Sequence, residues 1–165
     1  EKLLDVIEEG YDMASGIVPH LNFPELKRKT KFVKSIINKI EVNEQGDITK
    51  FGDDCGYSYI EEEILPAHHF RTNLLYKSEI SKKISYEKGL SFVGFREETF
   101  FSMRALWLGY KIGIHTGAKA YHLQTPSGGC RYPNYNELVQ SDDTIFRMWF
   151  RNMFNKKGNP LEVKK

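Results

Sequence analysis

Hydrophobic residues recur at helical spacing in several stretches of the chain. Leu3, Leu4 and Ile7 share one face of a short segment that Gly10 ends, and Phe100, Met103 and Trp107 share one face of a longer segment that Gly109 ends. Ser141-Asp142-Asp143 has the composition of a helix start, with acidic residues near the positive end of the helix dipole. The pattern predicts helices over residues 3–9, 24–40, 78–84 with Ser78 as cap, 96–108, and from Ser141-Asp142-Asp143 to about 154.

Runs rich in small, β-branched and aromatic residues alternate with these helices and predict strands. A hairpin is expected over residues 42–51 around Gln45-Gly46-Asp47. A strand is expected at 57–65, and Pro66 should end it. The other strands are expected at 12–19, 70–76, 110–115 and 118–123, with loops at 52–56, 86–95 and 125–131. This alternation predicts a single domain over residues 1–165, of the α/β or mixed α+β class.

Composition excludes several classes of protein. The 165 residues are 40% hydrophobic and 28% charged, which excludes a disordered chain. The net charge of 24 − 22 = +2 gives no reason to expect a nucleic-acid partner. The sequence contains no run of about 18 apolar residues, so no transmembrane helix is expected. Cys55 and Cys130 are too few for a disulfide framework, so we expect free thiols and a cytoplasmic location.

The acidic pair Glu97-Glu98 is the sharpest chemical signal, because it follows Gly94 at the predicted start of a helix. Acidic residues in a first turn are common, since they interact favourably with the helix dipole. The functional interpretation is that one carboxylate accepts a proton from a hydroxyl as that hydroxyl attacks a carbon. Adjacent helical residues point about 100° apart, so the two carboxylates cannot do the same job.

A second signal follows the predicted strand that ends in His122. Histidine is a ligand for divalent metals, although a single histidine at a strand end is more often structural. The Ser127-Gly128-Gly129 loop can turn backbone N–H groups toward an anion, and Arg131 can pair with a phosphate. Together, these residues favour a polyanion site.

The stretch 92–131 resembles the C-terminal half of the catalytic domain of family-2 glycosyltransferases, which have the GT-A fold. That family has a glycine loop, an acidic pair opening a helix, a later arginine, a Gly-Tyr-Lys segment and a strand ending in histidine. The corresponding positions here are Gly94, Glu97-Glu98, Arg104, Gly109-Tyr110-Lys111 and His122. Residues 3–18 and 69–80 and the pair Arg151-Asn152 also resemble parts of the family. The family's Asp-x-Asp motif is absent, and Glu98 stands where Asp is usual.

The resemblance implies a partial GT-A fold whose N-terminal nucleotide-binding half is missing, so the chain reads as a piece of a longer protein. It implies Glu98 as the general base of an inverting transfer, with Glu97 holding the acceptor or orienting the loop. His122 would complete the coordination of Mg²⁺ or Mn²⁺, which the fragment alone would not retain. Ser127, Gly128, Gly129 and Arg131 would bind the donor diphosphate, whereas Arg104 is expected to pair structurally with an acid.

The implied partners are a nucleotide-sugar donor and a sugar or lipid-linked acceptor, with peripheral membrane contact as an option. The fragment on its own is expected to be inactive. Strands that have lost their neighbours would leave exposed edges, which favour homodimers.

A different class of function stays open at this point. The basic face of the predicted helix 24–40 and the aromatic helix 145–154 would suit a non-enzymatic module that binds anionic surfaces or membranes. The simpler interpretation of residues 145–154 is a helix packed on the sheet, since an apolar stripe normally faces a core. A metal-dependent hydrolase using Glu97, Glu98 and His122 is a weaker option, because no second His or Asp has useful spacing.

Overall fold

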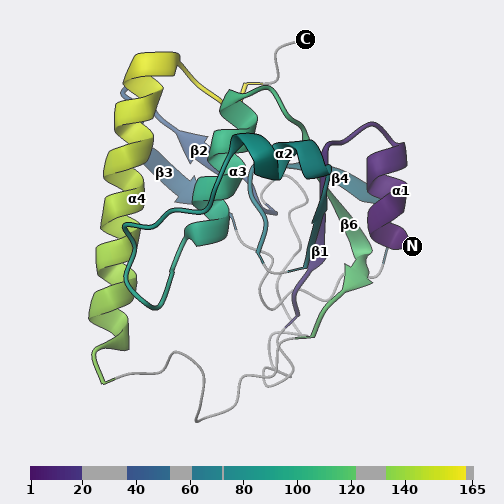
Figure 1. The fold of residues 1–165 in the computed structure, drawn as a ribbon, viewed down its shortest axis with the longest axis horizontal. Coiled ribbons are helices and arrows are strands. Elements are labelled where there is room, and N and C mark those ends of the chain that lie inside the picture. Colours follow the sequence, from purple (N-terminus) through teal and green to yellow (C-terminus); the bar gives the residue numbers. More distant parts are fainter. Residues whose placement is uncertain (20–36, 53–60, 72, 122–132, 163–165) are drawn as a thin grey trace.

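A mixed four-stranded sheet organises the fold in this computed structural model, which describes residues 1–19, 37–52, 61–71, 73–121 and 133–162 (Figure 1). The strand order is β4-β6-β1-β5. The central strands β1 (Met13–Ile17) and β6 (Ile112–Lys119) are parallel. The outer strands β4 (Ile64–Ala67) and β5 (Leu74–Tyr76) are antiparallel to their neighbours.

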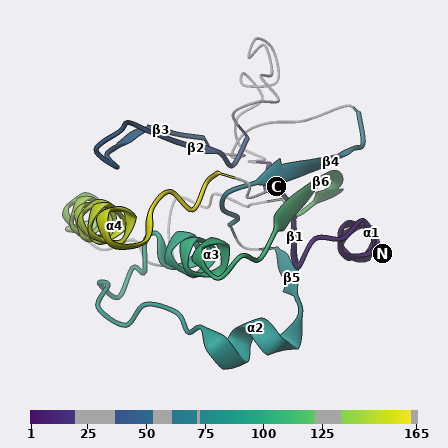
Figure 2. The same ribbon diagram turned by 90° about the horizontal axis from the view of Figure 1, so that it is seen from above.

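Helices cover both faces of this sheet, as Figure 2 shows. Helix α1 (Lys2–Glu8) lies on one face, so close that a Cβ on Gly113 would be 2.7 Å from Cγ1 of Val6. Helix α3 (Glu97–Trp107) lies on the other face, where Phe101 and Ala105 share a buried cluster with the alternating Ile112 and Ile114. Because β1 is covered on both sides, all five of its residues are buried, which explains its run of small and apolar residues.

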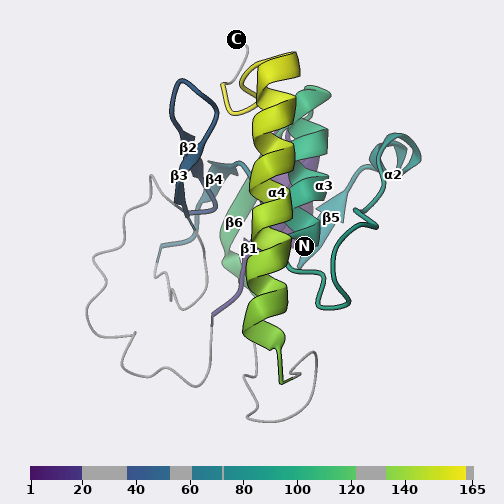
Figure 3. The same cartoon turned by 90° about the vertical axis from the view of Figure 1, so that its left-hand side faces the viewer.

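A second cluster lies beyond α3, away from the sheet. Helix α4 (Tyr135–Lys157) runs beside α3, and the hairpin of β2 (Ile40–Val42) and β3 (Ile48–Phe51) packs against both (Figure 3). The contacts are largely aromatic: the ring of Phe146 lies 5.0 Å from Phe100, and Trp149 lies 5.3 Å from Trp107. Helix α2 (Ser78–Lys83) follows the edge strand β5.

Much of the predicted architecture is confirmed. The described residues form a mixed sheet with helices, as the α/β or mixed α+β prediction requires. The helix at 3–9, the strand at 12–19 and the hairpin over 42–51 are present with shifts of one or two residues. Helix α3 ends before Gly109, whose φ of 87° is the left-handed value of a helix stop.

The prediction that a helix begins at Ser141-Asp142-Asp143 is wrong, because α4 begins two turns earlier, at Tyr135. The predicted break between strands at 110–115 and 118–123 is wrong, because β6 runs unbroken from Ile112 to Lys119, with the Oγ1 of Thr116 donating to the Glu61 carbonyl and accepting from the Glu63 amide. Residues 122–123 of the second predicted strand lie outside the described residues.

Smaller differences concern element ends. Pro66 does not end a strand but lies inside β4, where its lack of an N–H is tolerated because β4 is at the sheet edge. Ser78 is the first residue of α2 rather than its cap. The strand expected at 70–76 is confirmed only over β5.

The predicted helix 24–40 does not reach its expected end, since residues 37–39 are not helical and Ile40 belongs to β2. Residues 24–36 of that prediction lie outside the described residues, as do residues 57–60 of the strand predicted at 57–65, residues 53–56 of the loop predicted at 52–56 and the whole loop predicted at 125–131.

The stripe of aromatic residues on α4 is a core element, and its side chains differ sharply in exposure. Phe150 is 0% exposed and Met148 is 63% exposed. Replacing Phe150→Ala should lower the free energy of unfolding by about 3–5 kcal/mol, because it leaves a cavity among aromatic rings. Met148→Ala on the same helix should change it by less than about 0.5 kcal/mol. Urea unfolding followed by circular dichroism measures both, and equal effects would contradict this packing.

Candidate functional site

The acidic pair lies at the end of the sheet where the parallel strands finish. Helix α3 turns through Gly109 into β6 and therefore runs opposite to it, and β1 is parallel to β6. The first turn of α3, with Glu97 and Glu98, is consequently at the carboxyl end of β1 and β6 (Figure 1). In open α/β sheets, this end is where ligands usually bind.

A tight turn with two left-handed residues sets the start of α3. Gly94 has a φ of 63°, and Arg96, the N-cap residue, has a φ of 75°. The Gly94 amide donates to the Ser91 carbonyl at 3.0 Å, and the Glu97 amide donates to the Gly94 carbonyl at 3.1 Å. Glycine adopts this conformation without steric cost, whereas Arg96 must be held in it.

Three contacts hold Arg96. Its Nε donates to Oδ1 of Asp143 at 2.7 Å, and its guanidinium lies 3.7 Å from the ring centre of Phe51 and 4.5 Å from that of Phe95. Burial opposes the charge on Asp143, but hydrogen bonds from Arg147 and Arg96 outweigh it and hold the pKa of Asp143 below its ordinary value. The strained N-cap is thus tied to both α4 and β3.

Asp142 on α4 fastens the loop before α3. It is 0% exposed. Its Oδ1 accepts from the Ser91 amide at 2.8 Å, and its Oδ2 accepts from the Ser91 hydroxyl at 2.8 Å and from the Phe95 amide at 3.0 Å. A buried carboxylate with three donors is well satisfied, so this loop has a defined position relative to α4.

The two glutamates face different surroundings. A Cβ on Gly94 would be 3.3 Å from Oε2 of Glu97, so the Glu97 side chain folds back over the turn. Glu98 precedes the buried Phe101 by one helical turn and Ala105 by two, on the side of α3 that faces the sheet. The structure therefore gives the acidic pair two distinct environments, as the 100° angle between neighbours predicts.

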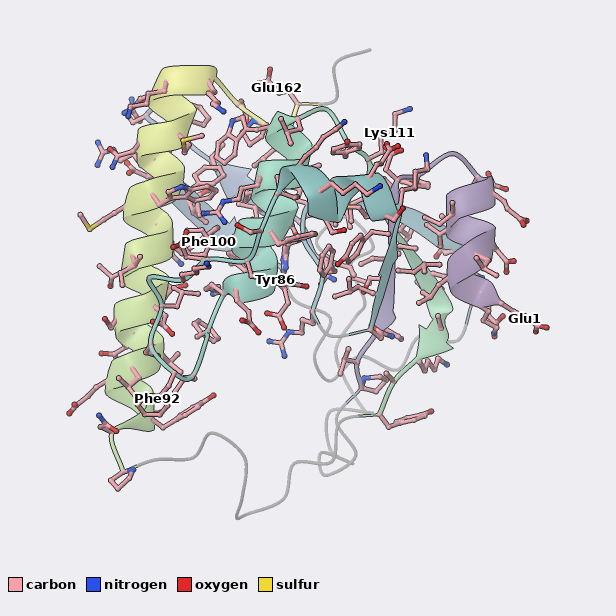
Figure 4. All side chains as sticks on the ribbon, viewed as in Figure 1. Glu1, Tyr86, Phe92, Phe100, Lys111 and Glu162 are labelled. Carbon is pink, nitrogen blue, oxygen red and sulfur yellow. The ribbon has the colours of Figure 1, made fainter. Side chains whose placement is uncertain are left out.

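Burial raises the pKa of Glu98 above its ordinary value. The negative charge of Glu97 raises it further, while a bond to its own backbone amide and the positive charge of Arg71 lower it. Tyr86 stacks on Phe101 at 4.8 Å, and its own pKa is raised by burial, by Tyr76, and by the charges of Glu98 and Glu97. Figure 4 shows Tyr86 in the middle of the molecule, beside α3. The site thus contains a half-buried carboxyl on a rigid helix, close to an arginine and a tyrosine.

The other predicted site residues are not described. His122, Ser127, Gly128, Gly129 and Arg131 all lie outside the described residues, so their distance from Glu98 stays a prediction. The segment that contains these residues follows β6, which ends at Lys119 at the same end of the sheet as Glu98. Tyr121 is the last described residue before it.

The described residues do not contain a cluster of potential metal ligands. Across residues 1–19, 37–52, 61–71, 73–121 and 133–162, no three His, Cys, Asp or Glu side chains are grouped so that they could hold a metal ion. The expected binding of Mg²⁺ or Mn²⁺ through His122 stays a prediction.

Arg104 has the structural role that the sequence predicts. It pairs with Glu87, and its Nη1 donates to the Ser85 carbonyl at 2.7 Å. Residues 83–88 and Arg104 line a shallow cavity of about 380 Å³, and a larger one of about 520 Å³, lined by Leu106 and Trp107, lies where α3 ends. Glu98 lines neither of them, so the cleft that its proposed chemistry requires stays a prediction.

Sequence reasoning missed Asp142 and Asp143 as supports of the site, because it placed them at a helix start. The available signal was their spacing: Asp142, Phe146, Trp149 and Phe150 follow helical periodicity, which places Asp142 on the buried face.

In comparisons with known proteins, no protein-family profile, curated protein or solved structure matches this chain. In the part of the chain that the structure describes, no helix is both long and apolar enough to cross a membrane.

Replacing Asp142→Asn should loosen the turn before α3. Asparagine has nearly the same shape as aspartate. Its NH₂ group, however, would face the N–H and O–H donors that now donate to a carboxylate oxygen of Asp142. We expect a loss of about 1–3 kcal/mol in the free energy of unfolding. Amide hydrogen exchange at Ser91 and Phe95 should also speed up. Glu137→Gln, at an exposed position of the same helix, is the matched control, and unchanged exchange in Asp142→Asn would contradict the assigned role.

Replacing Glu98→Gln should stabilise the fold at pH 7. A carboxyl whose pKa is higher in the folded than in the unfolded state destabilises the fold wherever it is ionised in both states. The melting temperature of Glu98→Gln should therefore exceed that of the unchanged protein at pH 7. The difference should shrink as the pH falls through the folded-state pKa toward the unfolded-state value. Glu79→Gln, in the exposed first turn of α2, should show no such trend.

Proposed function

We propose that this chain is the acceptor-side part of an inverting glycosyltransferase, similar to family 2, in which Glu98 is the general base. The observation that carries the proposal is the position of Glu98. It is a half-buried carboxyl with a raised pKa, fixed on the first turn of α3 at the carboxyl end of β1 and β6. A base in such a position meets its substrate without reorganising the fold.

The chemistry assigned to Glu98 is a single displacement. The ionised carboxylate accepts the proton of an acceptor hydroxyl while that oxygen forms a bond to the anomeric carbon of the donor sugar. The bond between that carbon and the phosphate oxygen breaks, and its electron pair leaves with the nucleoside diphosphate. The attack comes from the opposite side, so the anomeric configuration inverts. A raised pKa suits this role, because it makes the carboxylate a stronger base than an ordinary glutamate.

The order of elements supports the same proposal. Residues 3–18 contain a helix and a strand, residues 74–83 a strand and a helix, and residues 94–119 a glycine turn, the acidic helix and a strand, which are the kinds of element that the resemblance implies for these segments. Among the described residues β5 is an edge strand, where strands of the proposed nucleotide-binding half could add.

The remaining assignments belong to this proposal. Glu97 holds the acceptor or the turn, and Ser127, Gly128, Gly129 and Arg131 bind the leaving diphosphate, with His122 as the metal ligand. A divalent ion bound there would neutralise charge on the diphosphate.

The alternative function, a membrane-binding module, requires exposed aromatic side chains on α4. Phe146 and Phe150 are buried, and Trp149 packs against Phe100 and Trp107. The aromatic side chains that would enter a lipid headgroup region are therefore part of the interior. The basic face of the predicted helix 24–40 lies mostly outside the described residues.

The test is sugar transfer by a protein that contains this chain together with the proposed nucleotide-binding half. Glu98→Gln should lower kcat by about 10²–10⁴-fold, the usual contribution of a positioned base. The affinity for the nucleotide should not change, because Glu98 does not contact it in the proposed mechanism. The pH profile of kcat/KM should rise through the raised pKa of Glu98 and become flat in the variant.

The matched control is Glu79→Gln, an exposed first-turn glutamate on α2, which should leave transfer unchanged. Transfer by Glu98→Gln at the rate of the unchanged protein would overturn the base assignment. Retention of the anomeric configuration in the product would overturn the single-displacement mechanism.

A further inference from the structure

A cavity lies at the end of α3 that is remote from Glu98. It has a volume of about 520 Å³, within the range of small-molecule sites. It is formed where the C-terminal ends of α3 and α4 meet the turn between α1 and β1 and the start of β6. Figure 4 labels Lys111 and Glu162, which both line it, along that edge of the molecule.

Part of the cavity wall is apolar, and two of its aromatic rings are held in place. Trp107, Tyr110 and Leu161 line it. The indole Nε1 of Trp107 donates to the Gly158 carbonyl at 3.1 Å, and the hydroxyl of Tyr110 accepts from Nζ of Lys83 at 2.7 Å. Both rings are thereby fixed in orientation, so a flat apolar group entering the cavity meets ordered surfaces.

The charged groups around the cavity are mostly cations. Lys39, Lys111 and Lys157 line it, together with the exposed carboxylates Glu9 and Glu162. Lys157 is in the last turn of α4, where a cation already complements the helix dipole. Lys39 belongs to no helix and is half-buried, and no described residue forms an ion pair with it. Burial lowers the pKa of its ammonium, which is the signature of a cation without a counter-charge.

His68 lies in the same wall. Its Nδ1 lies 3.0 Å from the Ile40 amide nitrogen and 3.1 Å from the Ile40 carbonyl oxygen, so this ring nitrogen is engaged by the backbone of Ile40 in either tautomer. Burial, and then the charge of Lys39, lower the pKa of His68 to about 4, so the ring is uncharged at neutral pH. Lys39 is thus a cationic hydrogen-bond donor of the cavity wall, beside an uncharged imidazole.

We propose that this cavity binds a small organic anion with a flat apolar body, whose carboxylate, sulfonate or phosphate group pairs with Lys39 while the body lies against Trp107 and Leu161. The site is independent of the proposed transferase chemistry, because about 12 Å of α3, from Glu98 to Leu106, separates the two.

The test uses two probes with the same rings, the anion 1-anilinonaphthalene-8-sulfonate and the neutral N-phenyl-1-naphthylamine. We expect the anion to bind once per chain and to accept fluorescence energy from Trp107 in a Trp149→Phe background. Lys39→Met should weaken binding of the anion about tenfold, since it removes a charge-assisted hydrogen bond. The same change should leave binding of the neutral probe unaltered.

Two further variants make the result decisive. Lys82→Met, at an exposed position on α2, should bind both probes normally. Leu161→Trp should fill the cavity and abolish binding of both, with melting curves confirming that each variant folds. Unchanged binding of the anion in Lys39→Met, an equal loss of both probes in it, or full binding in Leu161→Trp would overturn the proposal.

Discussion

The position of the candidate site depends on one buried carboxylate, Asp142. It joins α4 to the turn before α3 by accepting hydrogen bonds from Ser91 and from the Phe95 amide. Without these bonds, two part-buried backbone amides would have no described acceptor, and each such group costs up to about 1–3 kcal/mol. The interaction therefore fixes where α3 begins, and with it the direction in which Glu98 projects.

This dependence explains why the aromatic face of α4 must be internal. Asp142 can reach the turn only if α4 lies along α3, and the contacts of Phe146 with Phe100 and of Trp149 with Trp107 hold it there. The left-handed Arg96 is then stabilised by Asp143 from α4 and Phe51 from β3. A conformation that is unfavourable for arginine is thus maintained by two elements that are distant in sequence.

The sequence predicted features that depend on neighbouring residues. The start of α3 at Glu97, its end before Gly109 and the hairpin around Gly46 follow from local turn chemistry and helical spacing. The roles of Asp142 and Asp143 depend on partners 51 and 47 residues away, so the same acidic residues looked like a helix start. The cavity beside Lys39 escaped prediction for the same reason, because its lining comes from five separate segments.

The two ends of α3 differ in a way that bears on the function of each. At its amino end, the positive end of the helix dipole and Arg71 favour the ionised form of Glu98, while burial and Glu97 oppose it. On balance the pKa of Glu98 is raised, so its carboxylate is more basic than one in water, which suits a proton acceptor. At the carboxyl end, the dipole disfavours an anion, so binding there depends on a cation supplied from outside the helix. Lys39, from the segment before β2, is such a cation, and its lack of a described acidic partner distinguishes it from a lysine that only completes a surface ion pair.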